Sequence, residues 1–140
     1  PPDNTITSSE EPLNVSLLIP IDNARDQELF VTLSWESNGT SFDLFFGDIS
    51  DSLQLSESNL SQQSYTMGVL EYKTTYFWQV LAEGSGSTLL SDIRSFTTMR
   101  EPLYITLLSP ADSAIDLDVL LELYWDSNGQ NYDLYFGENI

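Results

Sequence analysis

FVTLSWESNGTSFDLFFG, residues 30–47, is the stretch of this chain that decides its fold, because it returns as LLELYWDSNGQNYDLYFG at residues 120–137. The two stretches belong to a longer repeat, in which residues 11–50 align with residues 101–140 at a constant offset of 90 positions and without a gap. Eighteen of the 40 aligned residues are identical, including a tryptophan, an Asn-Gly pair and a Phe-Gly pair. The sequence therefore predicts two copies of one structural unit.

Hydrophobic residues in this stretch alternate with a period of two, which is typical of strands that bury one face. The large apolar residues that share a face in its two runs are Val31, Leu33, Trp35, Phe42, Leu44 and Phe46. Residues 75–84, TYFWQVLAEG, alternate in the same way. Asp-Asn, Asn-Gly and Gly-Ser-Gly turn signals separate the runs. Short strands with such turns over about 90 residues predict an all-β, two-sheet sandwich.

The Asn38-Gly39 pair has two interpretations. Between two alternating runs it is the strongest short signal for a β-hairpin, which would pair residues 30–36 with residues 41–47. In a sandwich, the same turn carries the chain from one sheet to the other. We prefer the crossover because of a family resemblance.

Five features carry that resemblance: the proline-ended run LLIP, Trp35, the run FDLFFG, the stretch from Leu70 to Val80, and the closing run SFTT. With them, residues 11–100 resemble a fibronectin type III domain, of the kind found in tandem in bacterial surface proteins and extracellular enzymes. The resemblance implies an immunoglobulin-like sandwich with tandem repeats.

The resemblance also implies roles for single residues. Trp35 is expected to be the central core tryptophan, with Trp125 at the same position of the second repeat. Leu70 and Tyr76 stand in a Leu-x-x-x-Thr-x-Tyr pattern, which in this family places the tyrosine hydroxyl against nearby backbone. Trp78 shares a face with Tyr76 and is expected to lie in the core.

Three segments follow from the repeat. Residues 1–10 are a linker or the last strand of a preceding repeat, residues 11–100 are a complete domain, and residues 101–140 are the first half of a second repeat. The inner face of that half repeat lacks the strands that should cover it, and exposed apolar faces favour association. We expect residues 101–140 to be disordered in a monomer or ordered by contact with another chain, so self-association is a candidate property.

Composition excludes several classes of function. The 22 acidic residues against four basic ones give a net charge of −18, which repels nucleic acid. Neither cysteine nor histidine is present, so thiol chemistry and the usual general base and transition-metal ligand are excluded. No apolar run is long enough to insert into a membrane. We expect a non-enzymatic protein without a cofactor.

Outward-facing aromatic residues are the first candidates for binding. If the third and sixth strands of the sandwich are neighbours, as the resemblance implies, then Phe45, Phe77 and Gln79 share its outer face. Such a patch suits sugar rings, a peptide or another domain. The alternative is a cross-strand aromatic pair that only stabilises the sheet.

Acidic loops are the second candidates. Asp22 and Asp26 recur as Asp112 and Asp116, and calcium prefers several carboxylate and carbonyl oxygens in a flexible loop. The spacing lacks the dense acidic pattern of an EF-hand, and aspartate is also an ordinary turn former.

Three functions remain open. The first, suggested by the resemblance, is an extracellular or cell-surface spacer and scaffold that contacts proteins or carbohydrates. The second is an auxiliary carbohydrate- or protein-binding module of a secreted enzyme. The third is a subunit of an assembly in which a neighbouring chain completes residues 101–140.

Overall fold

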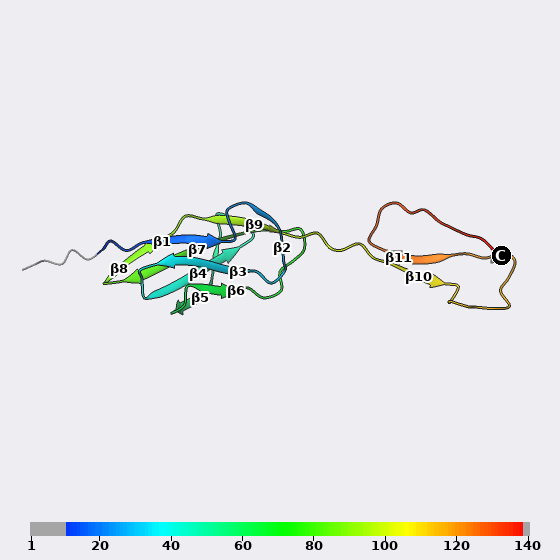
Figure 1. Cartoon of the computed structure of the whole chain (residues 1–140), viewed down its shortest axis with the longest axis horizontal. Coiled ribbons are helices and arrows are strands. Elements are labelled where there is room, and N and C mark those ends of the chain that lie inside the picture. The colour runs from blue at the N-terminus through cyan, green and yellow to red at the C-terminus, as the bar shows by residue number, and fades with distance from the viewer. Residues whose placement is uncertain (1–10, 139–140) are drawn as a thin grey trace, which may run out of the picture. The chain divides into compact units, whose positions relative to one another are not determined.

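The computed structural model describes residues 11–138, and every regular element in that range is a β-strand (Figure 1). The strands are β1 (Val15–Ile19), β2 (Ala24–Gln27), β3 (Thr32–Ser37), β4 (Ser41–Gly47), β5 (Gln54–Leu60), β6 (Ser64–Thr66), β7 (Thr75–Gly84), β8 (Ser87–Leu90), β9 (Arg94–Thr98), β10 (Ile105–Ser109) and β11 (Tyr124–Ser127). The chain divides into two units between Arg100 and Glu101. Residues 1–10, the expected linker or preceding strand, lie outside the described residues.

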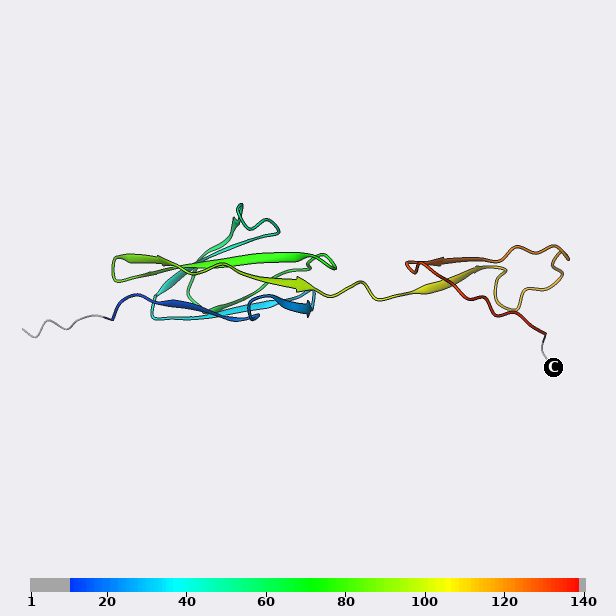
Figure 2. The ribbon, with the colours of Figure 1, turned by 90° about the horizontal axis from the view of Figure 1, so that it is seen from above.

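In the first unit the strands form two sheets, which Figure 2 shows as two layers. The smaller sheet has the order β1-β3-β6, and the larger has the order β2-β9-β7-β4-β5, with β8 also beside β7. Neighbouring strands are antiparallel except for β2 and β9, which are parallel. The predicted all-β architecture, with the layers of a sandwich, is confirmed.

The Asn38-Gly39 turn carries the chain between the layers. Because β3 belongs to the smaller sheet and β4 to the larger, the crossover is confirmed and the hairpin was wrong. Asn38 fixes the turn: its Nδ2 donates to the Pro12 carbonyl at 3.0 Å, and its Oδ1 accepts from the Asn14 amide at 2.8 Å. A Cβ on Gly39 would lie 2.9 Å from the Glu83 carbonyl oxygen, so glycine is required by this close approach.

The core lies between the two sheets and follows the alternation of the sequence. Its largest fully buried side chains are Leu33, Phe42, Leu44, Trp78, Val80 and Phe96. Trp35 of β3 packs edge-on against Phe42 of β4, with ring centroids 5.6 Å apart, and so joins the smaller sheet to the larger. Burial of these side chains, each contributing about 1.5–3 kcal/mol or more, is the main stabilising term of the first unit.

The second unit repeats the pairing of β1 with β3. Leu17 lies opposite Trp35, and Leu107 lies opposite Trp125, with an irregularity at the same place in both ladders. Trp125 packs edge-on against Tyr132 at 5.5 Å, as Trp35 does against its own partner. The same residue pattern therefore produces the same local structure at both positions.

The expectation that Trp125 is a core residue was wrong for this chain. Trp35 is 2% exposed, whereas Trp125 is only half-buried. Leu107 and Leu134 are 79% and 61% exposed, although their first-unit counterparts are buried. The physical reason is that residues 101–138 contribute only β10 and β11, which leaves one layer without a second. These two strands pair within the single chain, and association with another chain stays a prediction.

Candidate functional site

The outer face of the larger sheet carries the residues that the sequence pattern selects for binding. β4 pairs with β7 so that Phe45 lies opposite Gln79 and Gly47 lies opposite Phe77. All three predicted residues therefore share one face. Phe45 and Phe77 are diagonal neighbours across β4 and β7, a separation that aromatic side chains can span, so a cross-strand aromatic pair that only stabilises the sheet stays an alternative.

Three leucines extend this face, and sequence reasoning missed them. Leu55 of β5 lies opposite Phe45, and Leu90 of β8 lies opposite Leu81 of β7. Leu55 and Leu90 are 54% and 50% exposed. We call Phe45, Leu55, Phe77, Leu81 and Leu90 the outer-sheet patch. In the sequence, Leu55 lies in a serine-rich stretch and Leu90 directly precedes Ser91. The alternation around each leucine is too short to show which strand it pairs with.

The predicted exposed aromatic platform requires a correction. Phe45 and Phe77 are half-buried; Phe45 lies opposite Leu55 of β5, and Phe77 lies between Gly47 of β4 and Ser95 of β9. Gln79 is also half-buried, and its Nε2 donates to the Ser91 carbonyl at 2.8 Å. Ser91 in turn accepts from the Val80 amide at 3.0 Å through its Oγ. Gln79 therefore binds the segment between β8 and β9 to β7. The exposed part of the outer-sheet patch consists of Leu55 and Leu90 rather than of the aromatic residues.

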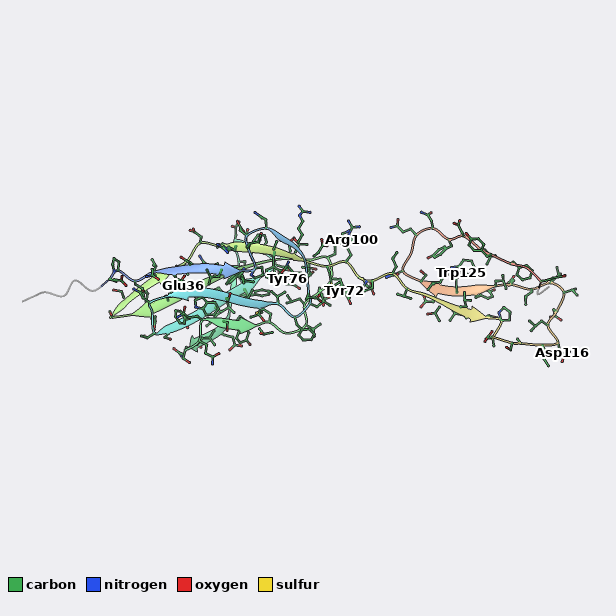
Figure 3. All side chains as sticks on the ribbon, viewed as in Figure 1. Glu36, Tyr72, Tyr76, Arg100, Asp116 and Trp125 are labelled. Carbon is green, nitrogen blue, oxygen red and sulfur yellow. The ribbon has the colours of Figure 1, made fainter. Side chains whose placement is uncertain are left out.

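Tyr76 and Leu70 are structural. The Tyr76 hydroxyl accepts a hydrogen bond from the Glu71 amide at 3.1 Å, which is the bond that the pattern predicts. Its ring stacks on Phe46 at 5.0 Å and contacts Phe96 at 5.9 Å, and Leu70 packs against the same core. Figure 3 labels Tyr76 inside the first unit. This corner ties the loop before β7 to the sandwich.

Of the acidic candidates in the first repeat, Asp22 serves the turn between β1 and β2. Its Oδ1 accepts from the Ser95 amide at 3.0 Å, and the neighbouring Asn23 amide donates to the Ser95 carbonyl at 2.8 Å. Asp26 lies four residues on, in β2, with a positive φ of 54°. The geometry at Asp22 is that of a turn former.

The counterparts in the second unit are Asp112 and Asp116, which are both exposed; Figure 3 labels Asp116. Within residues 11–138, no group of three histidine, cysteine, aspartate or glutamate side chains gathers in a way that could hold a metal ion. Neither Asp22 with Asp26 nor Asp112 with Asp116 therefore belongs to such a group within its own unit.

A hydrogen bond links the edges of the two sheets. The Tyr65 hydroxyl of β6 donates to Glu57 Oε1 of β5 at 2.6 Å. That bond, followed by burial and the carboxylate charge, raises the pKa of Tyr65 above its ordinary value of 10.0. A hydrogen bond to Glu122 raises the pKa of Tyr124 in the second unit in the same direction. Both phenols are therefore protonated at neutral pH.

Comparisons with known proteins found no match: no protein-family model, no curated protein and no solved structure matches the chain. Among the described residues, no helix is long and apolar enough to cross a membrane. The fold and the site thus define a class: an all-β chain whose first unit has two packed sheets and an apolar outer face.

Proposed function

We propose that the chain is a non-enzymatic, fibronectin type III-like tandem module outside the cell or at its surface, and that it acts as a spacer and as a scaffold for contacts with proteins or carbohydrates. The observation that carries this proposal is structural repetition. The same strand register and the same tryptophan contact recur at an offset of 90 residues. Only residues 99–104 connect β9 to β10, and such a short connection suits an array of small domains.

The chemistry of the side chains supports a role without catalysis. The chain has no histidine or cysteine to act as a base or nucleophile. Where carboxylates are engaged, at Asp22 and Glu57 for example, they hold turns and edges of the sandwich. Function on such a scaffold depends on surface contacts rather than on a buried reaction centre.

The outer-sheet patch is the proposed contact surface, and it also favours the second candidate, a carbohydrate- or protein-binding module of a secreted enzyme. Leu55→Asp with Leu90→Asp places two charges on its exposed part without changing the core. We expect this double variant to bind at least about tenfold more weakly than the parent to the immobilised polysaccharides or extracellular proteins that retain residues 1–140, since losing about 1.4 kcal/mol is tenfold in Kd.

The matched control is Val69→Asp, because Val69 is 71% exposed and lies outside the strands of the larger sheet. It should bind as the parent does. The leucine positions are better probes than Phe45→Ala and Phe77→Ala, which also remove half-buried packing. Equal retention of the double variant and the parent would exclude the patch as the contact surface.

The open face of the second unit favours the third candidate, an assembly subunit. Leu107 and Leu134 are exposed on that face, whereas the equivalent residues of the first unit, Leu17 and Leu44, are buried. Light scattering on residues 1–140 beside residues 1–100, at matched concentration, tests this candidate. The assembly requires the longer chain to be dimeric or larger and the shorter one monomeric, and two monomers would contradict it.

A further inference from the structure

The few cations of this chain are not scattered. The sequence has only four, namely Arg25, Lys73, Arg94 and Arg100. Three of them, all except Arg94, line one open hollow of about 500 Å³ in the first unit. Arg94 lies elsewhere and donates from Nη1 to the Leu18 carbonyl at 3.1 Å. In a chain with a net charge of −18, most of the positive charge is thus concentrated at one place.

The backbone brings the three cations together from distant parts of the sequence. β2, which contains Arg25, pairs with β9, so that Gln27 lies opposite Thr98. The Lys73 amide donates to the Met99 carbonyl at 2.9 Å, and Arg100 follows directly. Figure 3 labels Arg100 where the chain leaves the first unit. Paired strands and loop hydrogen bonds therefore fix the backbone positions from which the three cationic side chains extend around the hollow.

The remaining lining residues carry no positive charge. They are Asp26, Thr97 and Thr98. The Thr97 hydroxyl bonds the Thr75 hydroxyl at 2.8 Å, and the Thr98 hydroxyl donates to the Glu71 carbonyl at 2.6 Å. Three cations and one carboxylate give the hollow two net positive charges.

Asp26 is the one carboxylate among the six residues that line the hollow. Asp26, the carboxylate in the hollow, does not neutralise it.

We propose that this hollow binds a compact oxyanion: a carboxylate, a sulfate or a phosphate group of a small molecule or of a sugar residue. The guanidinium of arginine presents planar pairs of N–H donors that match two oxygens of such a group, and a lysine ammonium adds a further charge. The acidic remainder of the surface repels a long polyanion, so the site favours a group whose charge fits wholly within the hollow. This site is separate from the outer-sheet patch, and its existence does not depend on the function proposed for that patch.

The test is a titration of residues 1–140 with two probes, inorganic sulfate and sodium glucuronate, followed by the backbone amide signals in NMR spectra. A background of about 0.15 M sodium chloride shortens the Debye length to about 8 Å and suppresses the distant field. We expect saturable shifts at Lys73, Thr97, Thr98 and Arg100 with at least one probe. Saturation by sulfate assigns the site to tetrahedral oxyanions, and saturation by glucuronate assigns it to carboxylates.

Variants separate this site from general charge attraction. Arg25→Gln and Arg94→Gln each remove one positive charge from the same unit, but only Arg25 lines the hollow. We expect Arg25→Gln with Arg100→Gln to weaken binding at least tenfold and Arg94→Gln to leave it within about twofold, with circular dichroism spectra like that of the parent. Shifts that stay linear with both probes, or saturable binding that the double variant retains, would overturn the proposal.

Discussion

Trp35→Ala is expected to lower the free energy of unfolding of the first unit by about 3–5 kcal/mol. Trp125→Ala, at the equivalent position of the second unit, is expected to change that free energy by less than about 0.5 kcal/mol. The two substitutions are chemically identical and lie 90 residues apart in the repeat. The two sites differ in one respect: a second sheet covers Trp35, and no second sheet covers Trp125 within residues 101–138.

The difference follows from burial. Trp35 is 2% exposed and joins the two sheets through its contact with Phe42. An indole buries about 200 Å², which at about 25 cal/mol per Å² corresponds to roughly 5 kcal/mol. The Trp35 indole N–H is buried without a hydrogen-bond partner within the described residues, which offsets part of this gain. Trp35→Phe should therefore cost much less than Trp35→Ala.

Urea unfolding of the parent and of the three variants, followed by circular dichroism, measures these differences. The midpoint should fall for Trp35→Ala with little change in the denaturant slope, because the same surface is exposed on unfolding. Equal destabilisation by the two alanine variants would mean that Trp125 is as well covered as Trp35. That result would contradict the assignment of one layer to residues 101–138.

Most of the fold follows from the sequence because alternation and repetition are strong signals. Val31, Leu33 and Trp35 fall on the buried face that their spacing predicts, and the Asn38 turn crosses between the sheets. The hydrogen bond of Tyr76 also lies where the spacing from Leu70 places it. Alternation alone determines the buried face, whereas the crossover at Asn38 and the hydrogen bond of Tyr76 were expected from the family resemblance, because an Asn-Gly pair between alternating runs by itself favours a hairpin.

The surface sites depend on tertiary pairing, which short patterns do not encode. The short runs with Leu55 and Leu90 do not show which strands they pair with, so Phe45, which lies opposite Leu55, was expected to be more exposed than it is. Gln79 binds the Ser91 carbonyl, a partner that becomes apparent only with the break between β8 and β9. Arg25 and Lys73 lie far apart in sequence and meet only because β2 pairs with β9.

The central claim is that residues 101–140 are the first half of the same sandwich as residues 11–100. At seven of the positions that face or flank the core before residue 50, the second unit keeps large apolar residues. In place of Leu17, Val31, Leu33, Trp35, Phe42, Leu44 and Phe46 it has Leu107, Leu121, Leu123, Trp125, Tyr132, Leu134 and Phe136. Residues 51–100 carry β5 to β9, the strands that the second unit lacks within residues 101–138. Residues 101–140 followed directly by residues 51–100 should therefore form one complete domain.

Tyr132 is the one position among these seven at which a second version of the chimaera is useful. Phe42 is 1% exposed, so the hydroxyl of Tyr132, which donates to the Gly129 carbonyl in the second unit, would be buried at the equivalent place and would cost about 1–3 kcal/mol if that bond were lost. A second version with Tyr132→Phe removes that cost. Residues 101–140 alone are the control, because chains of about 40 residues rarely bury enough surface to fold by themselves.

The most direct measurement is urea unfolding of both chimaeras and of the control, followed by circular dichroism. We predict a single cooperative transition for both chimaeras, with a slope of at least about 1 kcal/mol per molar urea, and no transition for residues 101–140 alone. If both chimaeras unfold gradually, as the control does, then the second unit is not the first half of this sandwich.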